Sequence, residues 1–344
     1  MFLNFFKRNP YKTLNASGFN PALPITFTYS CPNAARPSGG TKVIYKHVSI
    51  INQLQPGKVE AQVFHKKKPS FRCAWDFKNL KFKNDFKFDS CQEIYIVHEM
   101  WAPREAHSIK SAGIPYAIFV QNGYLINRKS DYLSTKFAYE NAEFILCVSE
   151  HIVKCVELAF PGLKHKIIRI TVSVDSNLFK PAEVKENTIT YMPRKLKKHA
   201  ELVLFFLEAH LPNHWKIKAI DGLDQNEVAK QLGQSKIFLS FSELEGIGLP
   251  PIEAALAGNK VIGYTGEAGK AYWLAPVFEE VHCGDILGFV RTILHSIYVW
   301  DNQKIDNRKF EEIRKTLAKR YGHEKELSDL KTLVDKVHIL LKSG

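Results

Sequence analysis

The sequence predicts an α/β protein made of two doubly wound, parallel-sheet domains in tandem. Short β-rich runs alternate with helical runs, and this alternation restarts after residue 185. Strands that alternate with helices indicate a parallel sheet with helices on both faces. A length of 344 residues fits two domains of about 150 residues each.

In the first half, helical segments separate short apolar runs that are typical of buried strands. These runs are Ile25–Tyr29, Val59–Phe64, Glu93–Val97, Tyr116–Val120 and Phe144–Val148. A loop containing Gly39 and Gly40 is predicted after the first strand, followed by a helix over 41–54.

The second half repeats the alternation. Predicted strands are Thr188–Met192, Trp215–Ile220, Lys236–Phe241 and Lys260–Tyr264, and predicted helices are His199–His210, Asp224–Leu232 and Pro250–Ala257. Asp224 with Glu227 forms a capping-box pattern at the start of one helix. The polar stretch Pro181–Asn187 is interpreted as the linker. The predicted domains are therefore 1–182 and 183–310, with a basic helical tail, 311–344, that packs back on the first domain.

The charge of the chain favours anionic partners but does not identify one class of them. A formal net charge of +13 favours nucleic acid, anionic lipid or phosphorylated small molecules, although a solvated basic surface with no specific partner is the alternative. None of the six cysteines forms a C-x-x-C pair, which predicts buried thiols in a reducing compartment rather than a zinc site or disulfides. The sequence shows no signal peptide and no apolar run of about 18 residues, so a cytoplasmic protein is expected.

The most specific segment is 242–258, in which a glycine-rich turn leads from a strand into a helix. Gly246 and Gly248 allow a ligand to approach the backbone closely, and the free N–H groups at the helix start suit an anion. Glu245 and Glu253 have seven residues between them and can both accept hydrogen bonds from sugar hydroxyls. The alternative is that Glu253 only complements the helix dipole from the first turn.

This segment resembles the E-x7-E signature of retaining glycosyltransferases of the GT-B fold, the family 4-like group, with Ile247 where the family often has phenylalanine. The resemblance implies two Rossmann-like domains that face a central cleft, an acceptor-side domain followed by a donor domain. It implies that Glu245 approaches the donor sugar and that Glu253 binds the nucleotide ribose. The neighbouring Gly246, Ile247, Gly248 and Leu249 are expected to contact the donor.

A second match lies at the end of the first domain. Val148-Ser149-Glu150, followed by the stretch 172–181, is similar to the segment that closes that domain in these enzymes. Ser173 replaces the usual glycine. The resemblance spans roughly residues 25–272.

The third match is the basic turn after the first strand of the second domain. The family places an arginine and a lysine there against the donor diphosphate, which implies Arg194 and, by spacing, Lys198, with Lys195 and Lys197 as alternatives. Such cations neutralise a pyrophosphate and stabilise it as it leaves. A solvated basic turn is the other interpretation.

Weaker candidates lie in the first domain. Gly40 is a candidate to cradle phosphate, or is only part of a turn. Gln121 and Asn122 stand where related enzymes often have a histidine near the transferred sugar. His98-Glu99 also ends a strand, and the stretch 265–269 in the second domain is a candidate to touch the sugar.

No D-x-D motif occurs, so neither a metal nor another cofactor is expected. The sequence thus predicts a metal-independent, retaining glycosyltransferase of cell-envelope polysaccharide synthesis. It would use a nucleotide-sugar donor and a glycan or lipid-linked acceptor, and nucleic acid is not expected to bind. The rival functions are another GT-B enzyme, such as a nucleotide-sugar epimerase, and a non-enzymatic polyanion-binding protein.

The first domain has three basic stretches: a lysine triplet at 66–68, and segments at the N-terminus and at 77–88 in which basic residues mix with aromatic ones. Surfaces of this kind bind anionic membranes, so a peripheral position on the inner face of the membrane is a further expectation. The alternative is an edge strand and a tail that pack on the core.

Overall fold

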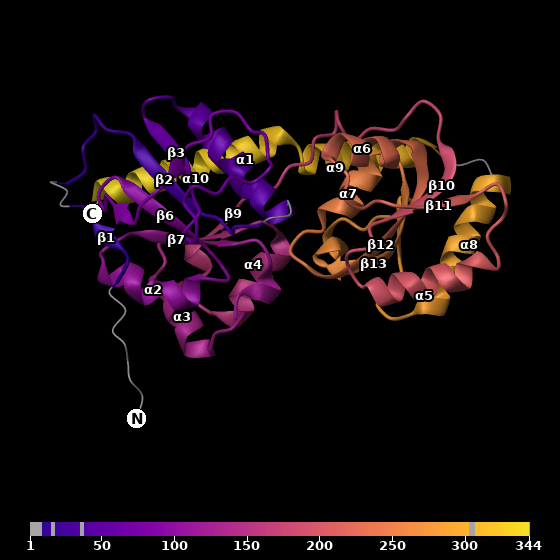
Figure 1. The fold of residues 1–344 in the computed structure, drawn as a ribbon, viewed down its shortest axis with the longest axis horizontal. Helices are drawn as coiled ribbons and strands as arrows, with labels where there is room; N and C mark the ends of the chain where they lie inside the picture. The colour runs from indigo at the N-terminus through magenta and orange to yellow at the C-terminus, as the bar shows by residue number, and fades with distance from the viewer. Residues whose placement is uncertain (1–8, 15–17, 35–37, 303–306, 344) are drawn as a thin grey trace. The chain divides into compact units, whose positions relative to one another are not determined.

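The computed structural model describes residues 9–14, 18–34, 38–302 and 307–343, and the chain divides into two compact units (Figure 1). Unit 1 comprises residues 1–170 and 327–344, and unit 2 comprises residues 171–326. Each unit holds one large parallel sheet with helices, as the sequence predicts.

The sheet of unit 1 has the order β4-β3-β2-β6-β7-β8-β9, and all its pairs are parallel. Its strands are β2 (Ile25–Ser30), β3 (Val59–Phe64), β4 (Phe82–Lys83), β6 (Glu93–His98), β7 (Tyr116–Val120), β8 (Phe144–Cys147) and β9 (Ile167–Arg169). A separate short pair joins β1 (Lys12–Thr13) to β5 (Lys87–Phe88). The chain turns in opposite directions from β2, so the topological switch point of this sheet lies between β2 and β6.

The helices of unit 1 are α1 (Gly39–Leu54), α2 (Ala102–Ser111), α3 (Tyr132–Asn141) and α4 (Glu150–Ala159), with short 3₁₀ turns at Gly123–Leu125 and Lys164–Lys166. The predicted glycine loop is wrong in one respect. Gly39 and Gly40 form the first turn of α1, because Ser38 caps the helix and completes a capping box with Thr41.

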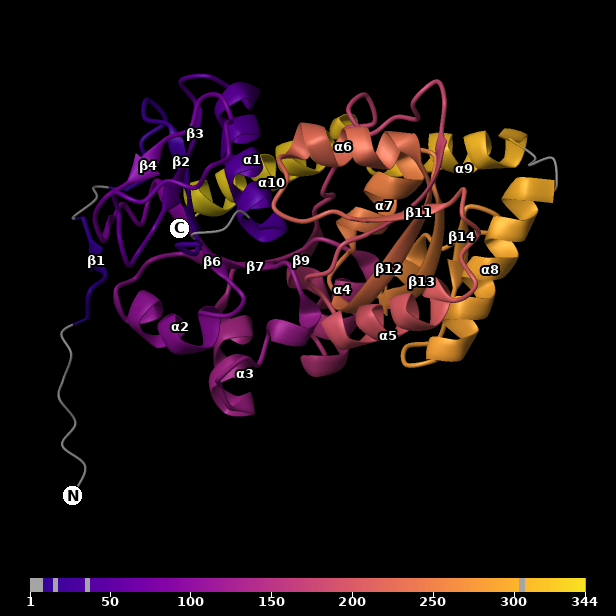
Figure 2. The ribbon, with the colours of Figure 1, turned by 45° about the vertical axis from the view of Figure 1, so that its right-hand side comes forward.

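The sheet of unit 2 has the order β11-β10-β12-β13-β14, again all parallel. Its strands are β10 (Glu186–Tyr191), β11 (Lys216–Ala219), β12 (Ser235–Glu245), β13 (Lys260–Glu267) and β14 (Phe278–Glu280). Its helices are α5 (Lys197–Glu208), α6 (Gln225–Gln234), α7 (Leu249–Leu256), α8 (Ile286–Asn302) and α9 (Asn307–Arg320), with a 3₁₀ turn at Ala268–Ala271. The switch point lies between β10 and β12. Figure 2 shows α6 and α7 on one face of this sheet and α5 and α8 on the other.

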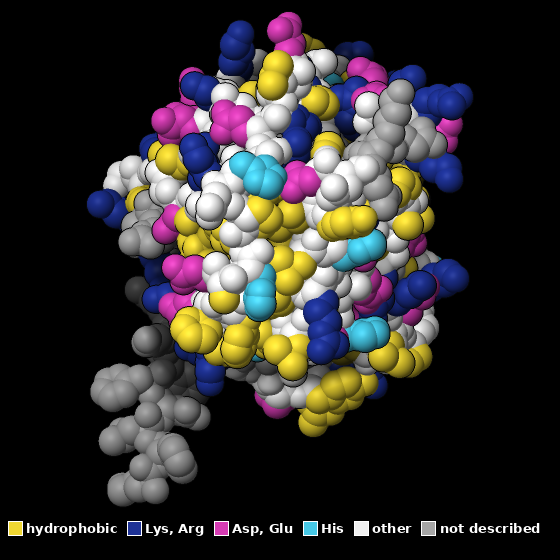
Figure 3. Space-filling view, turned by 90° about the vertical axis from the view of Figure 1, so that its right-hand side faces the viewer, with side chains coloured by type: hydrophobic (Ala, Val, Ile, Leu, Met, Phe, Trp, Pro, Cys, Tyr) yellow, Lys and Arg dark blue, Asp and Glu magenta, His cyan; other side chains and the backbone are white. Residues whose placement is uncertain are grey.

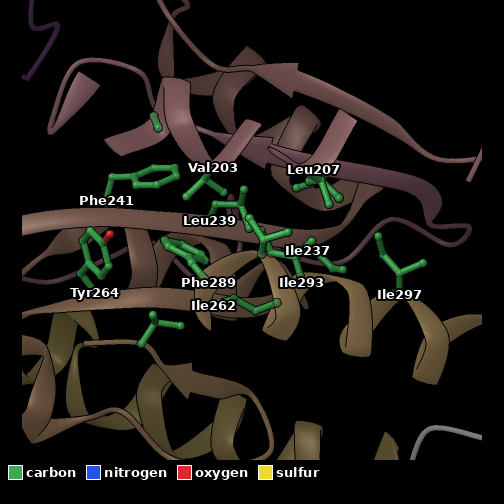
Figure 4. Packing of buried hydrophobic residues seen from close by; sticks show 14 of the residues in the cluster. Val203, Leu207, Ile237, Leu239, Phe241, Ile262, Tyr264, Phe289, Ile293 and Ile297 are labelled. Carbon is green, nitrogen blue, oxygen red and sulfur yellow. The ribbon is translucent and has the colours of Figure 1, made fainter. Parts of the chain in front are cut away.

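The core of unit 2 forms where α5 and α8 cover the central strands (Figure 4). Phe241, Tyr264 and Phe289 form an aromatic group in which the ring centroids of Phe241 and Phe289 lie 5.0 Å apart. Gly263 lets this packing happen: it has φ +131°, and a Cβ there would lie 2.6 Å from the Phe289 ring.

The boundaries differ from those expected. Residues 171–182 belong to unit 2, where the Val174 N–H bonds the Tyr321 carbonyl at 2.9 Å and the Ala182 N–H bonds the Gly233 carbonyl at 3.1 Å. The predicted linker, 181–187, is likewise part of unit 2, and its half-buried Lys185 donates hydrogen bonds to carbonyls at helix ends. Helix α9 belongs to unit 2, and only the part of α10 (His323–Ser343) from residue 327 belongs to unit 1. In the described part of the chain, no helix is both long enough and apolar enough to cross a membrane.

Candidate functional site

The candidate donor site lies at the carboxyl edge of the unit 2 sheet, at its switch point. Lys195 stands in the turn after β10, and Glu245 ends the neighbouring strand β12. The Lys195 Nζ donates a hydrogen bond to Glu245 Oε1. The Glu245 side chain is 17% exposed, whereas Lys195 is 45% exposed, so this carboxylate sits deeper than its partner. Ligands of doubly wound sheets bind at this position.

The turn before α5 is basic and strained. Leu196, the N-cap of α5, adopts φ 41° and ψ 48°, a left-handed conformation that disfavours residues with a Cβ. No acidic residue lies in the first turn of α5, and Lys197 and Lys198 begin the helix. Cations at a helix N-terminus oppose the helix dipole, so a bound anion would offset the positive charge at this helix start.

The predicted diphosphate residues differ in their surroundings. Arg194 and Lys198 are exposed, and Lys197 forms an exposed i,i+4 pair with Glu201 at 3.6 Å. Of the three alternative lysines, Lys195 is the one that meets Glu245. The choice of Lys198 for the diphosphate, made by spacing from the resemblance, stays a prediction.

A buried tyrosine supports the glycine turn before α7. Gly248 is the N-cap of α7 with φ 73°, and a Cβ on it would lie 2.8 Å from the Tyr272 hydroxyl. That hydroxyl bonds the carbonyls of Ile247 and Gly248 at 3.0 and 2.8 Å. Burial, with help from Tyr321 and Glu245, raises the pKa of Tyr272, so the hydroxyl stays protonated and donates.

The N-terminus of α7 has fewer free backbone N–H groups than the sequence predicts. Pro250 and Pro251 occupy the second and third positions of α7 and have no N–H. An anion there would therefore meet the N–H groups of Gly248 and Leu249. Gly246 and Ile247 are buried beneath this turn.

Glu253 lies half-buried on α7, as the fifth helical residue. The first turn contains no acidic residue, so the interpretation of Glu253 as a first-turn dipole partner is wrong. Glu245 and Glu253 lie on either side of the same glycine turn, one at the end of β12 and the other on α7.

A second carboxylate, which the sequence did not single out as a ligand, stands beside Glu245. Glu267 ends β13 directly opposite Glu245 in the strand register, with φ 65° and ψ −57°. Lys270 binds it at 2.9 Å. Gly266 permits this arrangement, because a Cβ there would lie 2.9 Å from Glu245 Cγ. The stretch 265–269 thus borders the donor site.

In unit 1 the predicted residues gather at the carboxyl edge of the sheet. The Gln121 amide donates to the Gly40 carbonyl at 3.0 Å, and a Cβ on Gly40 would lie 2.5 Å from Gln121 Oε1. Asn122 caps the following 3₁₀ turn by accepting from the Tyr124 N–H. Gly40 therefore makes room for Gln121.

His98 and Glu99 lie at the switch point of the same sheet. The His98 N–H donates to Ser30 Oγ at 2.9 Å, which links the ends of β6 and β2. His98 Nδ1 lies 2.8 Å from Glu99 Oε2, and both side chains are buried. The Asn122 N–H donates to Glu99 Oε1 at 3.2 Å, so this pair positions the loop that carries Gln121 and Asn122.

Comparison with solved structures identifies the fold of the chain. The lipopolysaccharide outer core galactosyltransferase WaaB shares it over 91% of this chain and 99% of its own, with a TM-score of 0.60 at 16% identity. The chain has the GT-B fold. Sucrose-phosphate synthase from Thermosynechococcus elongatus is similar over 92% of this chain and 99% of its own, with a TM-score of 0.69 at 10% identity. Anabaena HepE in complex with UDP matches over 93% of this chain and all of its own, with a TM-score of 0.63 at 12% identity.

Sequence comparison gives a nearer relative of this GT-B chain. It is 30% identical over 189 residues to an alpha-1,6-glucosyltransferase from Actinobacillus pleuropneumoniae serotype 7 (strain AP76). The match covers 52% of this chain and 54% of that protein, about half of each. No protein-family model matches the sequence.

Proposed function

We propose that this GT-B protein is a glycosyltransferase that moves a sugar from a nucleotide-diphosphate sugar to a glycan acceptor. The observation that carries the proposal is the meeting of Lys195 and Glu245 at the switch point of unit 2, between the basic start of α5 and the glycine turn before α7. The sequence similarity to an alpha-1,6-glucosyltransferase supports the same reaction class.

The geometry suggests a division of roles within unit 2. In transfer, the bond between the anomeric carbon and the diphosphate oxygen breaks, and a bond to the acceptor oxygen forms while the acceptor hydroxyl loses its proton. Arg194, Lys195 and Lys198 supply positive charge where the departing diphosphate gains negative charge. Glu245, released from Lys195 when the diphosphate takes that cation, accepts hydrogen bonds from the donor sugar, and Glu253 binds the ribose.

Metal independence and retention of the anomeric configuration belong to the proposal as well. The cations around the start of α5 offer the charge that a divalent ion would otherwise supply. Retention rests on the resemblance of the segment 245–253 to the E-x7-E signature.

UDP-glucose is the donor that we propose first. The sequence relative is named for glucose transfer, and HepE of the same fold has been solved with UDP-glucose. The proposed acceptor is a glycan, lipid-linked or free, in polysaccharide synthesis at the cytoplasmic face of the membrane.

Calorimetric titration with UDP and with uridine tests the nucleotide part of this proposal. Arg194→Ala should weaken UDP binding about 10- to 100-fold, because a charge-assisted hydrogen bond contributes about 1.5–3 kcal/mol, and should leave uridine binding almost unchanged. Arg291→Ala, an exposed arginine on α8, is the matched control. Equal losses for UDP and uridine would contradict the assignment of Arg194. If the wild-type protein binds RNA with a steep salt dependence and no nucleotide, the polyanion-binding function is correct instead.

We propose a smaller membrane-binding surface than the three basic stretches of the first domain. Of the three stretches, the N-terminal residues 1–8 lie outside the described residues. In the stretch 77–88, the ring centroids of Phe86 and Phe64 lie 4.9 Å apart, and Phe88 is fully buried. These two phenylalanines therefore pack on the core and do not face a membrane. Lys81 binds Glu60 at 2.6 Å, and Lys83 binds Glu93 at 3.2 Å.

The exposed cations left for an anionic membrane are Lys67, Lys68, Lys78 and Lys87, which have no ion-pair partner within the described part of the chain. Charge reversal of Lys67, Lys68 and Lys78 should abolish flotation with anionic liposomes, since each cation contributes only about 1 kcal/mol and several must act together. Neutralising Lys81, already paired with Glu60, should change flotation little. Flotation that ignores lipid charge or salt would exclude this contact.

A further inference from the structure

Two cysteines and a histidine meet in unit 1, far from one another in the sequence. The ligand atoms of Cys31, His65 and Cys73 all lie within 4.8 Å of one another, and all three residues are buried. The absence of a C-x-x-C pair predicts buried thiols rather than a zinc site, and 41 residues separate Cys31 from Cys73.

The sheet register explains the meeting. Strands β2 and β3 pair in parallel with Ser30 opposite Phe64, so the next residues, Cys31 and His65, leave the sheet side by side. The Cys31 N–H donates to the Phe64 carbonyl at 3.0 Å, which continues the ladder by one bond. Cys73 arrives from the loop between β3 and β4 and closes the group from the other side.

Hydrogen bonds already orient the imidazole. His65 Nδ1 lies 3.2 Å from the Cys31 carbonyl oxygen, which can accept the Nδ1 proton, so that Nε2 carries the lone pair that can act as a ligand. A bound ion would replace the hydrogen bond that this lone pair accepts from the Tyr45 hydroxyl. His65 Nε2 lies 2.8 Å from the Tyr45 hydroxyl, and the Cys73 N–H donates to that same hydroxyl at 2.9 Å. A backbone carbonyl that holds the second ring nitrogen is the usual support of a metal-binding histidine.

We propose that Cys31, His65 and Cys73 bind one Zn²⁺ ion, with the Tyr45 hydroxyl as the oxygen that completes four-coordination. Sulfur and imidazole nitrogen are the ligands that zinc prefers, and side-chain rotation brings atoms within 4.8 Å to the roughly 3.5 Å spacing of a tetrahedral site. Two thiolates balance the charge of the ion, so the buried group is neutral overall. Binding releases the two thiol protons to solvent.

The site would be structural. It would fasten the loop over residues 65–81 to the ends of β2 and β3 and to α1, which carries Tyr45. Gly40 and His98 lie at the same edge of the sheet. The ion would therefore stabilise the loops at the proposed acceptor side without taking part in the reaction. This inference does not depend on the proposed transfer activity.

Metal analysis of the full-length protein tests the proposal. The protein is purified under reducing conditions, stripped with a chelator, and dialysed against Zn²⁺ or Co²⁺. We expect about one equivalent of Zn²⁺ per chain by elemental analysis, and a Co²⁺ spectrum with thiolate charge-transfer bands and the strong visible bands of tetrahedral coordination. Zn²⁺ should raise the melting temperature.

Variants locate the ion. Cys31→Ser and Cys73→Ser should each weaken Zn²⁺ binding by about 100-fold or more, and Tyr45→Phe should weaken it less, by about tenfold. Cys91→Ser, a half-buried cysteine outside the group, should bind like the wild type. The wild-type Co²⁺ spectrum decides the matter even if a cysteine variant fails to fold. Absence of stoichiometric metal, a spectrum without sulfur ligation, or equal loss in Cys91→Ser overturns the proposal. So does thiol titration that shows Cys31 and Cys73 joined in a disulfide in the reduced preparation.

Discussion

Two residues with strained backbones flank the carboxylate at the centre of the candidate donor site. Leu196 precedes α5 with φ 41°, and Glu267 ends β13 with φ 65°, although neither is glycine. Such conformations cost about 1–3 kcal/mol each and persist where the surroundings enforce them, commonly at ligand sites. Here they place Lys195 and Glu267 on either side of Glu245.

The ribose role of Glu253 is testable by a single isosteric change. Glu253→Gln should reduce transfer at least tenfold, equivalent to about 1.4 kcal/mol of transition-state stabilisation, because the amide replaces a charged acceptor. Initial rates with varied donor concentration measure the effect, and circular dichroism checks the fold. The control is Glu279→Gln on β14, which breaks an ion pair with Lys260 away from the glycine turn. Full activity of a folded Glu253→Gln protein would remove this residue from the site.

The sequence identified the candidate donor-site segments, but it did not predict which of their side chains contact one another. The segment 245–253 and the basic turn were found because a strand, a glycine turn and a helix follow one another locally. The contact between Lys195 and Glu245 joins two segments that are 50 residues apart in the sequence, so local patterns do not reveal it. The group of Cys31, His65 and Cys73 depends on the pairing of β2 with β3, which spacing does not reveal.

At the scale of elements, one half-buried lysine, Lys185, bonds to the ends of two helices in unit 2. The Lys185 Nζ donates to the carbonyls of Gly233, Ser235 and Ala257 at 3.1, 2.6 and 2.9 Å. These carbonyls lie at the C-terminal ends of α6 and α7, where helices leave acceptors without partners. The polar, proline-containing stretch 181–187 is typical of a linker, so the sequence did not predict this role of Lys185.

Replacement of Lys185 should therefore destabilise unit 2. Lys185→Met should lower the free energy of unfolding by about 2–4 kcal/mol at pH 9, since the neutral amine present at this pH still offers two N–H donors to the buried carbonyls at these helix ends. Lys216→Met, an exposed lysine on β11, should stay within about 0.5 kcal/mol of the wild type. Urea denaturation measures both. A neutral effect of Lys185→Met would show that these helix ends do not need the lysine.

The same lysine makes stability depend on pH. Burial, followed by repulsion from Arg314 and Lys236, lowers the pKa of Lys185 from 10.5 to about 7. Between these values the unfolded chain binds more protons than the folded chain, so the free energy of unfolding rises as the pH increases from 7 towards 10. This rise should be smaller in Lys185→Met. Equal slopes for the two proteins would show that Lys185 stays protonated in the folded state.

At the scale of the whole molecule, both units share one design: strand order places the candidate residues at a switch point. In unit 2 that point lies between β10 and β12, and in unit 1 between β2 and β6. The sequence predicted the parallel α/β class of both units because strand and helix periods alternate along the chain. It missed the boundary at 170/171, since residues 171–182 are held by bonds to Tyr321 and Gly233, remote in sequence.

The exposed face of α5 and α8 also belongs to this scale. Figure 3 shows apolar and histidine side chains among scattered charged ones on the side of unit 2 that these helices cover. Phe205 is 70% exposed and Tyr298 58% exposed. Because charged residues interrupt this surface, it does not by itself identify a partner.

Donor turnover is the measurement that tests the central claim most directly. The purified protein is incubated with UDP-glucose, with and without glycan acceptors and without added metal, and the release of UDP is followed alongside Glu253→Gln. The account predicts acceptor-stimulated release of UDP with glucose on the acceptor, not increased by added Mg²⁺ or Mn²⁺ and reduced at least tenfold in the variant. Release that needs no acceptor and yields an epimerised sugar would indicate the epimerase. No binding or turnover of UDP-glucose or any other nucleotide sugar by the folded protein would contradict the account.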